Sequence, residues 1–272
     1  MQVLKQTIAN QECFKASLQL AQYFQKDCLP VEHYQQMLNA WAIQAQQSLK
    51  LSQFNQSDLN AFVRFFYVDL AFSADEHHYF AKQNSLINKV MEFRTGIPMS
   101  LAIVFQALAQ QLGFNVQGIN FPGHFLLRAD FADAQSIYLD PNNGNVLSHS
   151  DLEALYFRIL GDIEQEKMPP EALLSASSEE SIVRLLHNLK AAYITAQDFQ
   201  LALVAVELLV KLCPNDPYER RDRGFLLHQL DCSQVAIADY QYFIRQCPQD
   251  PASALLAEQV KHLVAQPSEI FH

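Results

Sequence analysis

A histidine and an aspartate sixteen residues apart form the most chemically suggestive pattern in this chain of 272 residues. His124 begins one short segment of strand-like residues, and Asp140 ends the next. On neighbouring strands, a carboxylate can orient an imidazole and stabilise its protonated form, so that the imidazole acts as a general base. The pair therefore predicts a site able to activate a hydroxyl or a thiol held nearby.

The segment that would supply this group is a predicted helix over 98–112. Almost all its residues are apolar, which indicates a helix buried on all sides. Pro98 suits the first helical turn and Gly113 suits the C-terminal cap. Ser100, in the first turn, is the only obvious nucleophile, and it would need His124 as its base because a hydroxyl is a weak acid.

After this helix the hydrophobic period changes to two residues. Three segments then predict a small antiparallel sheet packed on the buried helix: 114–121, 124–129 and 136–140.

Two capping-box patterns predict further helix starts. Ser150 with Glu153 opens a helix to about residue 160, and Ser177 with Glu180 opens the next. The stretch between them contains Pro169-Pro170 and is the predicted linker.

Four motifs in this part of the chain resemble those of the bacterial SirB-one family: 84–90, 94–101, 122–128 and 139–144. The resemblance implies a transglutaminase-like domain followed by tetratricopeptide repeats, and the family name implies an association with the regulation of host invasion. In a transglutaminase-like core, a cysteine at the N-terminus of the helix is the nucleophile. Here that place falls on Pro98, and no cysteine lies between Cys28 and Cys213, which excludes thiol catalysis at this site.

Two interpretations of the site stay open. One is a serine-dependent amidase or protease that uses Ser100, His124 and Asp140. The other is a non-catalytic pocket, in which Ser100 bonds to backbone groups of the first helical turn while His124 and Asp140 hold two strands together.

The C-terminal third repeats itself with a period of 34 residues. The shift aligns Cys213, Pro214, Asp216 and Pro217 with Cys247, Pro248, Asp250 and Pro251. The period resembles the tetratricopeptide repeat, in which each unit is a pair of helices. It predicts helices over 182–197, 200–212, 217–230 and 233–246, closed by a helix from Pro251 to about residue 265. Helical spacing also predicts helices over 13–29, 33–49 and 59–72.

Four further residues are candidates for binding. Arg94 would pair with Asp140 or with an incoming carboxylate, and Asn142 lies in a polar turn after that aspartate. Arg221 and Arg245 belong to a locally basic part of the repeat region, where an acidic peptide or protein partner is one prediction and ordinary solvated charge is the other.

The formal charge of −10 argues against binding to nucleic acid or to anionic membranes. We expect a cytoplasmic protein with five reduced cysteines and with neither cofactor nor metal, since His77-His78 and the turn after Asp140 supply too few ligands. The oligomeric state is left open, and structural self-assembly is a third interpretation.

The sequence therefore predicts an α+β fold that is mostly helical, with a small antiparallel sheet on a buried helix. A lead-in and transglutaminase-like domain would span 1–165, and an all-α repeat region 176–272. The leading hypothesis is a non-catalytic interaction or regulatory protein, a pseudoenzyme that binds its partner through the repeat groove.

Overall fold

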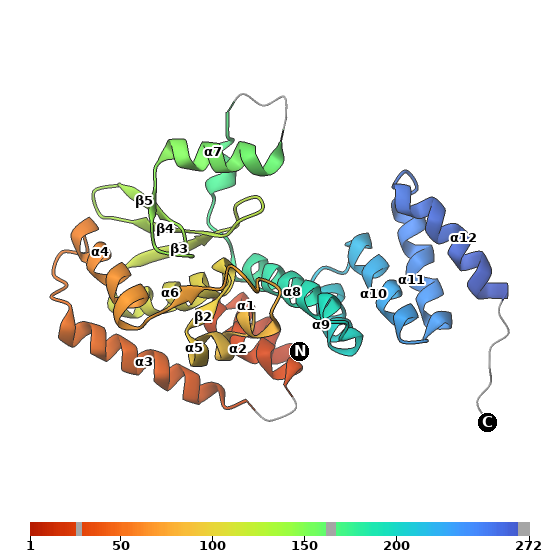
Figure 1. Cartoon of the computed structure of the whole chain (residues 1–272), viewed down its shortest axis with the longest axis horizontal. Helices are drawn as coiled ribbons and strands as arrows, with labels where there is room; N and C mark the ends of the chain where they lie inside the picture. The colour runs from red at the N-terminus through yellow and green to blue at the C-terminus, as the bar shows by residue number, and fades with distance from the viewer. Residues whose placement is uncertain (26–28, 162–166, 266–272) are drawn as a thin grey trace. The chain divides into compact units, whose positions relative to one another are not determined.

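The computed structural model describes residues 1–25, 29–161 and 167–265. The chain divides into two compact units, Met1–Leu185 and the part from Leu186 onward, and the division falls within helix α8 (Ser178–Thr195). The end of the expected helix 13–29, part of the expected linker and residues 266–272 lie outside the described residues. The predicted α+β class is confirmed: the first unit holds small sheets among helices, and the second is helical (Figure 1).

Helix α6 (Pro98–Leu112) is the centre of the first unit and has the predicted bounds. Eleven of its fifteen residues are buried, so the helix is covered on nearly every side, as its apolar sequence requires. Gly113 ends it with a φ of 99°, a left-handed conformation that favours glycine.

A four-stranded antiparallel sheet packs on α6, through β3 (Asn115–Ile119) and β4 (Leu126–Asp130). It continues through β5 (Ser136–Leu139) to β6 (Val146–Leu147). The first three strands confirm the predicted sheet, whereas β6 was missed because two residues show no alternation.

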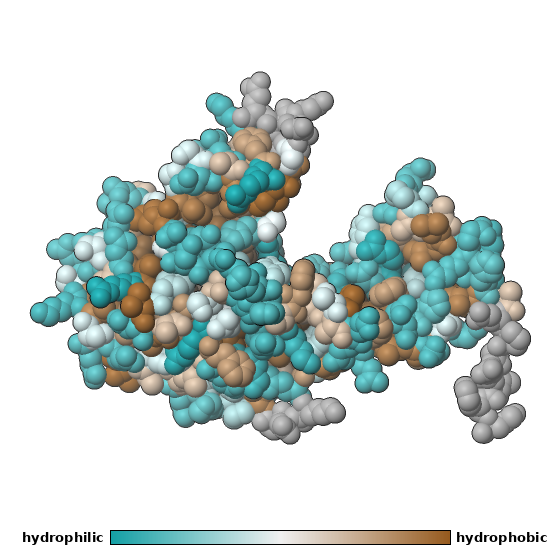
Figure 2. All heavy atoms as spheres, in the orientation of Figure 1, coloured by the Kyte–Doolittle hydropathy of each residue, from teal (hydrophilic) through white to brown (hydrophobic). Residues whose placement is uncertain are grey.

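Helix α7 (His149–Leu160) covers the other face of this sheet (Figure 1). Its Leu152 and Tyr156 pack on Ile119 and Leu126 of the strands. Figure 2 shows the corresponding band of hydrophobic residues along α7, where it faces the sheet.

The predicted start of α7 was wrong by two residues. Ser148 is the N-cap, and its side chain accepts the N–H of Asp151 at 3.2 Å, while Asp151 accepts the N–H of Ser148 at 2.9 Å. The pair Ser150 and Glu153 shows the same pattern, but Ser148 directly follows β6 and is the first residue free to begin the helix.

The remaining elements of the first unit are mostly helical. They are α1 (Gln2–Ala9), α2 (Cys13–Ala21), η1 (Gln22–Phe24), α3 (Val31–Ser48), α4 (Gln56–Arg64), η2 (Phe65–Asp69), β1 (Ser73–Ala74), η3 (Lys82–Asn84), α5 (Ile87–Phe93), β2 (Thr95–Gly96) and η4 (Pro170–Leu173). The helix expected over 59–72 is α4 followed by the π-helical turn η2, in which Leu70 N–H donates to the carbonyl of Phe65 at 2.8 Å.

The repeat helices match their predicted ranges to within a few residues. After α8 they are α9 (Phe199–Leu212), α10 (Pro217–Gln229), α11 (Ser233–Gln246) and α12 (Pro251–Ala265). The predicted capping box is confirmed, because Ser177 and Glu180 bond reciprocally at the start of α8. Gly224 lets α10 and α11 approach closely, since a Cβ there would lie 2.8 Å from the ring of Tyr240.

Candidate functional site

His124 and Asp140 lie together at one end of the sheet. His124 follows the turn before β4 and Asp140 follows β5, and these strands pair in the register that sets Leu127 opposite Leu139. The Nε2 atom of His124 is 3.3 Å from Oδ1 of Asp140. Burial acts to raise the pKa of Asp140, but hydrogen bonds from His124 and from the N–H of Asn142 outweigh it and hold that pKa below its ordinary value.

Tyr67, in the π-helical turn η2, holds the turn that follows Asp140. Its hydroxyl donates to the carbonyl of Pro141 at 2.8 Å. Burial, and then the charge of Asp140, raise the pKa of Tyr67, which keeps this donor protonated. Gly144 permits the contact, because its φ is 74° and a Cβ would lie 2.6 Å from the Tyr67 ring. Sequence reasoning missed Tyr67, since an aromatic residue in an apolar helix looks like any other core residue.

A cavity of about 620 Å³ opens beside the His124–Asp140 pair. Asn142 lines it together with these two residues, and the opposite wall comes mainly from the end of β6 and from α7. The remaining lining residues are Gly123, Leu147, Asp151, Ala154, Leu155, Arg158 and Ile159. Helix α7 contributes Asp151 and Arg158 as well as apolar side chains, so polar groups from both the sheet and the helix line the cavity. Such a lining suits binding of a small polar group.

Ser100 is fully buried, and its hydroxyl bonds to backbone atoms. Its Oγ lies 2.5 Å from the carbonyl oxygen of Asn84 and 3.1 Å from that of Ile97, and it accepts the N–H of Ile97 at 3.1 Å. Among the described residues, those that line the cavity beside His124 do not include Ser100. The structure thus brings two of the three candidate catalytic residues together and places the third against the backbone.

Arg94, which ends α5 with a φ of 58°, lies on aromatic rings. Its guanidinium carbon is 4.0 Å from the ring centroid of Trp41 and 5.1 Å from that of Phe72. The predicted pair with Asp140 was wrong, because Asp140 bonds to His124 and to the N–H of Asn142 instead. Burial lowers the pKa of Arg94. These contacts describe a cation held by aromatic faces.

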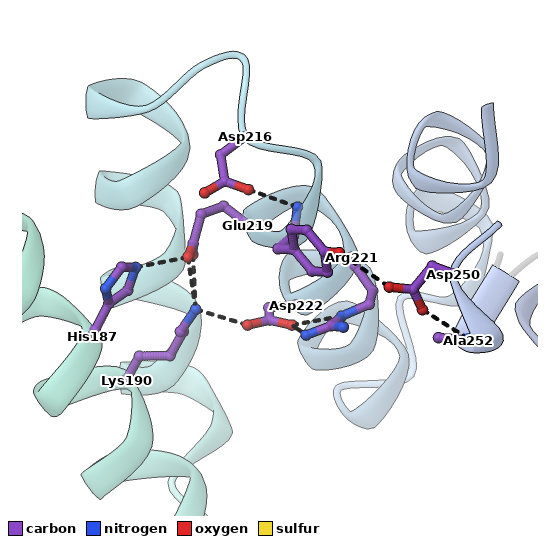
Figure 3. A network of polar contacts seen from close by, with 9 residues as sticks. His187, Lys190, Asp216, Glu219, Arg221, Asp222, Asp250 and Ala252 are labelled. Carbon is purple, nitrogen blue, oxygen red and sulfur yellow. Dashed lines mark hydrogen bonds and ion pairs between the residues drawn. The ribbon is translucent and has the colours of Figure 1, made fainter. Parts of the chain in front are cut away.

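In the repeat unit, Lys190 is at the centre of a network of ion pairs (Figure 3). Its Nζ lies 3.0 and 2.9 Å from the two carboxylate oxygens of Glu219 and 2.7 Å from Oδ2 of Asp222. His187 adds a contact of 2.8 Å to Glu219. Burial acts to raise the pKa of Glu219, but the bonds from His187 and Lys190 bring it below its ordinary value. The network joins α8 to α10.

The arginines of the predicted basic region are largely neutralised within the unit. Arg223 makes two bonds of 2.6 and 2.7 Å to the buried Asp239, and Arg220 adds one of 3.3 Å. Arg221 donates twice to Asp222, while Arg245 is exposed in the last turn of α11. Sequence reasoning counted these cations correctly but missed Asp239, whose burial no local pattern indicates.

Over residues 1–25, 29–161 and 167–265, no helix is both long and apolar enough to cross a membrane. In the same ranges, no group of three or more His, Cys, Asp or Glu side chains has an arrangement that could hold a metal ion.

Comparison with known proteins identifies both parts of the chain. Residues 32–187 match the family model described as the transglutaminase-like superfamily, and residues 189–261 match a tetratricopeptide repeat model. The chain is 42% identical over 203 residues to a UPF0162 protein of Vibrio cholerae, which covers 75% of this chain and 74% of the relative. It is 30% identical over 217 residues to Protein SirB1 of Salmonella typhimurium, covering 79% and 80%. The chain belongs to the UPF0162 and SirB1 family.

The predicted resemblance to the SirB-one family is therefore confirmed. UPF0162 protein YchA of Escherichia coli is another relative of this SirB1-family chain, 32% identical over 209 residues, or 76% of this chain and 77% of the relative. No solved structure matches. In this SirB1-family chain, the transglutaminase-like match contains Ser100, His124 and Asp140, and the repeat match contains Lys190 and Glu219.

Proposed function

We propose that this SirB1-family chain is a non-catalytic interaction protein. Its transglutaminase-like unit has no cysteine at the N-terminus of α6, where the thiol nucleophile is expected, and its short tetratricopeptide array binds a protein partner. The observation that carries the proposal is the position of Ser100. Its buried hydroxyl bonds to the backbone of Asn84 and Ile97, so it is not presented to the pair of His124 and Asp140.

The bonds of Ser100 have a structural role that its sequence position explains. Helix α6 begins at Pro98, and the N–H of Ile97 precedes the helix without an intrahelical partner. Ser100 accepts this N–H at 3.1 Å, and the same N–H lies 3.3 Å from the carbonyl oxygen of Asn84. The hydroxyl of Ser100 also donates to that carbonyl, so it joins the start of α6 to Asn84. Without an activated nucleophile, His124, Asp140 and Asn142 form a polar pocket that binds without reacting.

The repeat unit supports the binding role, because large apolar side chains remain exposed on it. Tyr218 and Phe225 of α10 and Leu255 of α12 are all exposed. Exposed aromatic residues of this kind are enriched in protein interfaces. Arg221 and Arg245 lie in the same unit, where they would contribute polar contacts at the edge of such an interface.

The alternative function is a serine-dependent amidase or protease that uses Ser100, His124 and Asp140. The observation that favours it is the 3.3 Å contact between His124 and Asp140 beside a cavity. It requires Ser100 to leave its backbone partners and reach the imidazole.

A fluorophosphonate probe separates the two functions. We expect the full chain to remain unlabelled, and the Ser100→Ala and His124→Ala variants to behave identically. Labelling that disappears in both variants would establish the serine enzyme and overturn the non-catalytic proposal.

A second experiment tests the binding role. Full-length protein is used as bait, and each recovered protein is purified and its binding measured again by calorimetry. We expect Phe225→Ala to weaken the binding of a true partner by about tenfold or more, in the range of an interface hot spot. His124→Ala serves as the control and leaves the affinity unchanged. The reverse pattern would place binding in the transglutaminase-like unit.

A further inference from the structure

The wall that α7 contributes to the cavity beside His124 carries a charged side chain near each end. Asp151, Ala154, Leu155 and Arg158 follow the spacing i, i+3, i+4 and i+7, which places them on one side of the helix, and all four line the cavity. Seven residues separate the aspartate from the arginine, so their Cα atoms lie about 10 Å apart along the helix axis. The wall therefore presents a carboxylate, an apolar middle and a guanidinium, in that order.

Arg158 is the cation of this wall, and its donors remain available. Across residues 1–25, 29–161 and 167–265, no hydrogen bond, ion pair or ring contact engages its guanidinium. A guanidinium carries five N–H donors in a planar fork, which can pair with a carboxylate through two parallel bonds. The cavity lining thus holds a site for a carboxylate on a ligand.

The two carboxylates of the lining use only one oxygen each within the described part of the chain. Asp140 accepts the contact from His124 at 3.3 Å and the N–H of Asn142 at 2.9 Å, both at Oδ1. Asp151 accepts the N–H of Ser148 at 2.9 Å and its hydroxyl at 2.6 Å, both at Oδ2. Since a carboxylate can accept about four hydrogen bonds, Oδ2 of Asp140 and Oδ1 of Asp151 can each accept one from a cation on a ligand.

These groups define the charges that a matching ligand carries. With the imidazole of His124 neutral, the charged groups of the lining are the carboxylates of Asp140 and Asp151 and the guanidinium of Arg158. Their complement is one carboxylate and two cations, which is the set of charges of a free amino acid with a basic side chain. An extended lysine spans about 7 Å from its carboxylate to its Nζ. One ion pair of about 3 Å then brings this length to the spacing of the charges on α7.

We infer that the cavity beside His124 binds a free basic amino acid such as lysine. The inference rests on the proposed function, because it names a ligand for the pocket that binds without reacting. The ligand carboxylate would pair with Arg158, its side-chain cation with Asp151 and its α-ammonium with Oδ2 of Asp140. Its methylene stem would lie on the apolar middle of the α7 wall.

The test is calorimetry of the full chain with L-lysine and three analogues, each of which lacks one charge. L-Norleucine lacks the side-chain ammonium, L-lysinamide lacks the carboxylate and Nα-acetyl-L-lysine lacks the α-ammonium. We expect each analogue to bind about tenfold or more weakly than lysine, because each loses a hydrogen bond between charged groups.

Matched variants assign the ligand carboxylate to Arg158. Arg158→Gln removes the cation of the wall, whereas Arg64→Gln removes the same charge from the exposed end of α4 in the same unit. We expect Arg158→Gln to weaken lysine binding by about tenfold and not to weaken lysinamide binding, since lysinamide has no carboxylate to lose its partner. Arg64→Gln should leave both affinities unchanged. Circular dichroism checks that both variants are folded.

Three results would overturn the inference: no binding of lysine, an analogue that binds as tightly as lysine, or equal losses of lysine binding in Arg158→Gln and Arg64→Gln. Failure of the proposed function appears separately, as labelling by the fluorophosphonate probe or in the calorimetry of recovered partners. Absence of lysine binding in an unlabelled protein would therefore reject the ligand and leave the non-catalytic function intact.

Discussion

The two units handle their ionisable side chains in opposite ways. In the transglutaminase-like unit, His124 and Asp140 share one contact at the wall of a cavity, so part of each group faces open space. In the repeat unit, Lys190, Glu219 and Asp222 saturate one another between helices. The comparison shows that a residue type suited to chemistry becomes a site only where packing leaves its polar atoms unsatisfied.

The same contrast separates Ser100 from His124 within the first unit. Ser100 lies at the start of the most buried helix, where free backbone groups compete for its hydroxyl. His124 lies in a connection at the end of the sheet and lines the cavity. Burial has made one residue structural, whereas the other remains accessible to a ligand.

The largest expected effect is the loss of Lys190. Lys190→Ala removes the cation that bridges Glu219 and Asp222, and leaves Glu219 with His187 and Asp222 with Arg221. Breaking a buried ion pair from one side costs about 3–5 kcal/mol, and we expect the lower end of this range because these two partners remain. Hydrogen exchange of the α10 amides measures the change in the unfolding free energy of the repeat unit. The control is Lys211→Ala, at an exposed position, for which the change stays below about 0.5 kcal/mol. Similar changes in the two variants would mean that the Lys190 network contributes little to the unfolding free energy of the repeat unit.

Ser100→Ala should have the next largest effect. It removes the bonds of a fully buried hydroxyl to the N–H of Ile97 and to the carbonyl of Asn84, which keep only the longer bond of 3.3 Å that joins them to each other. At about 0.5–1.5 kcal/mol for each of the two lost bonds, the expected cost is about 1–3 kcal/mol. Denaturant unfolding followed by tryptophan fluorescence reports it, since Trp41 lies in the first unit. Ser150→Ala, which removes an exposed hydroxyl bonded to Ser148, is the control. A Ser100→Ala protein as stable as the Ser150→Ala control would show that the hydroxyl of Ser100 has no structural role.

His124→Ala should cost less, about 0.5–1.5 kcal/mol near neutral pH, the usual net contribution of a hydrogen bond. Because the folded-state pKa of Asp140 is lowered, its ionised form adds stability above its unfolded pKa of about 3.9, and this is lost as the pH falls through the folded-state value. In His124→Ala, the hydrogen bond from His124 no longer lowers the pKa of Asp140, so the variant loses the stability that this bond provides. Its stability should therefore approach that of the natural protein below about pH 4, as measured by denaturant unfolding across the acid range. A difference that persists at a pH where Asp140 is protonated in both proteins contradicts the assignment.

Arg245→Gln should have the smallest effect, below about 0.5 kcal/mol, because Arg245 is exposed at the end of α11. Arg223→Gln is the informative partner, since it removes a bidentate bond to the buried Asp239. The difference in melting temperature between these variants measures how much the bonds of Arg223 to Asp239 contribute to the stability of the repeat unit. Equal melting temperatures would mean that the bonds of Arg223 to Asp239 do not stabilise the repeat unit.

Much of the fold could be predicted because its signals are local. The apolar residues between Pro98 and Gly113 predicted α6 with its observed bounds, and the 34-residue period predicted the helices from α8 to α12. Local signals failed where two solutions were equally good, as for the capping boxes that begin at Ser148 and Ser150. They also failed where an element was too short to show a period, as for β6.

The candidate site was less predictable because its geometry depends on partners distant in the sequence. Strand order was sufficient to expect His124 near Asp140. The π-helical turn that brings Tyr67 to Pro141 joins residues 74 positions apart and leaves no mark in either segment. The aromatic contacts of Arg94 likewise come from Trp41 and Phe72, which no motif connects to it.

The order and spacing of neighbouring residues were enough to predict α6, the repeat helices, the first three strands of the larger sheet and the absence of a cysteine at the expected place. Only the folded chain shows which polar groups have hydrogen-bond partners. The hydroxyl of Ser100 bonds to the backbone, Arg223 bonds to Asp239, and Lys190 bonds to Glu219 and Asp222. The physical reason is that a hydrogen bond depends on distance and burial in space, and both are set by packing between segments far apart along the chain.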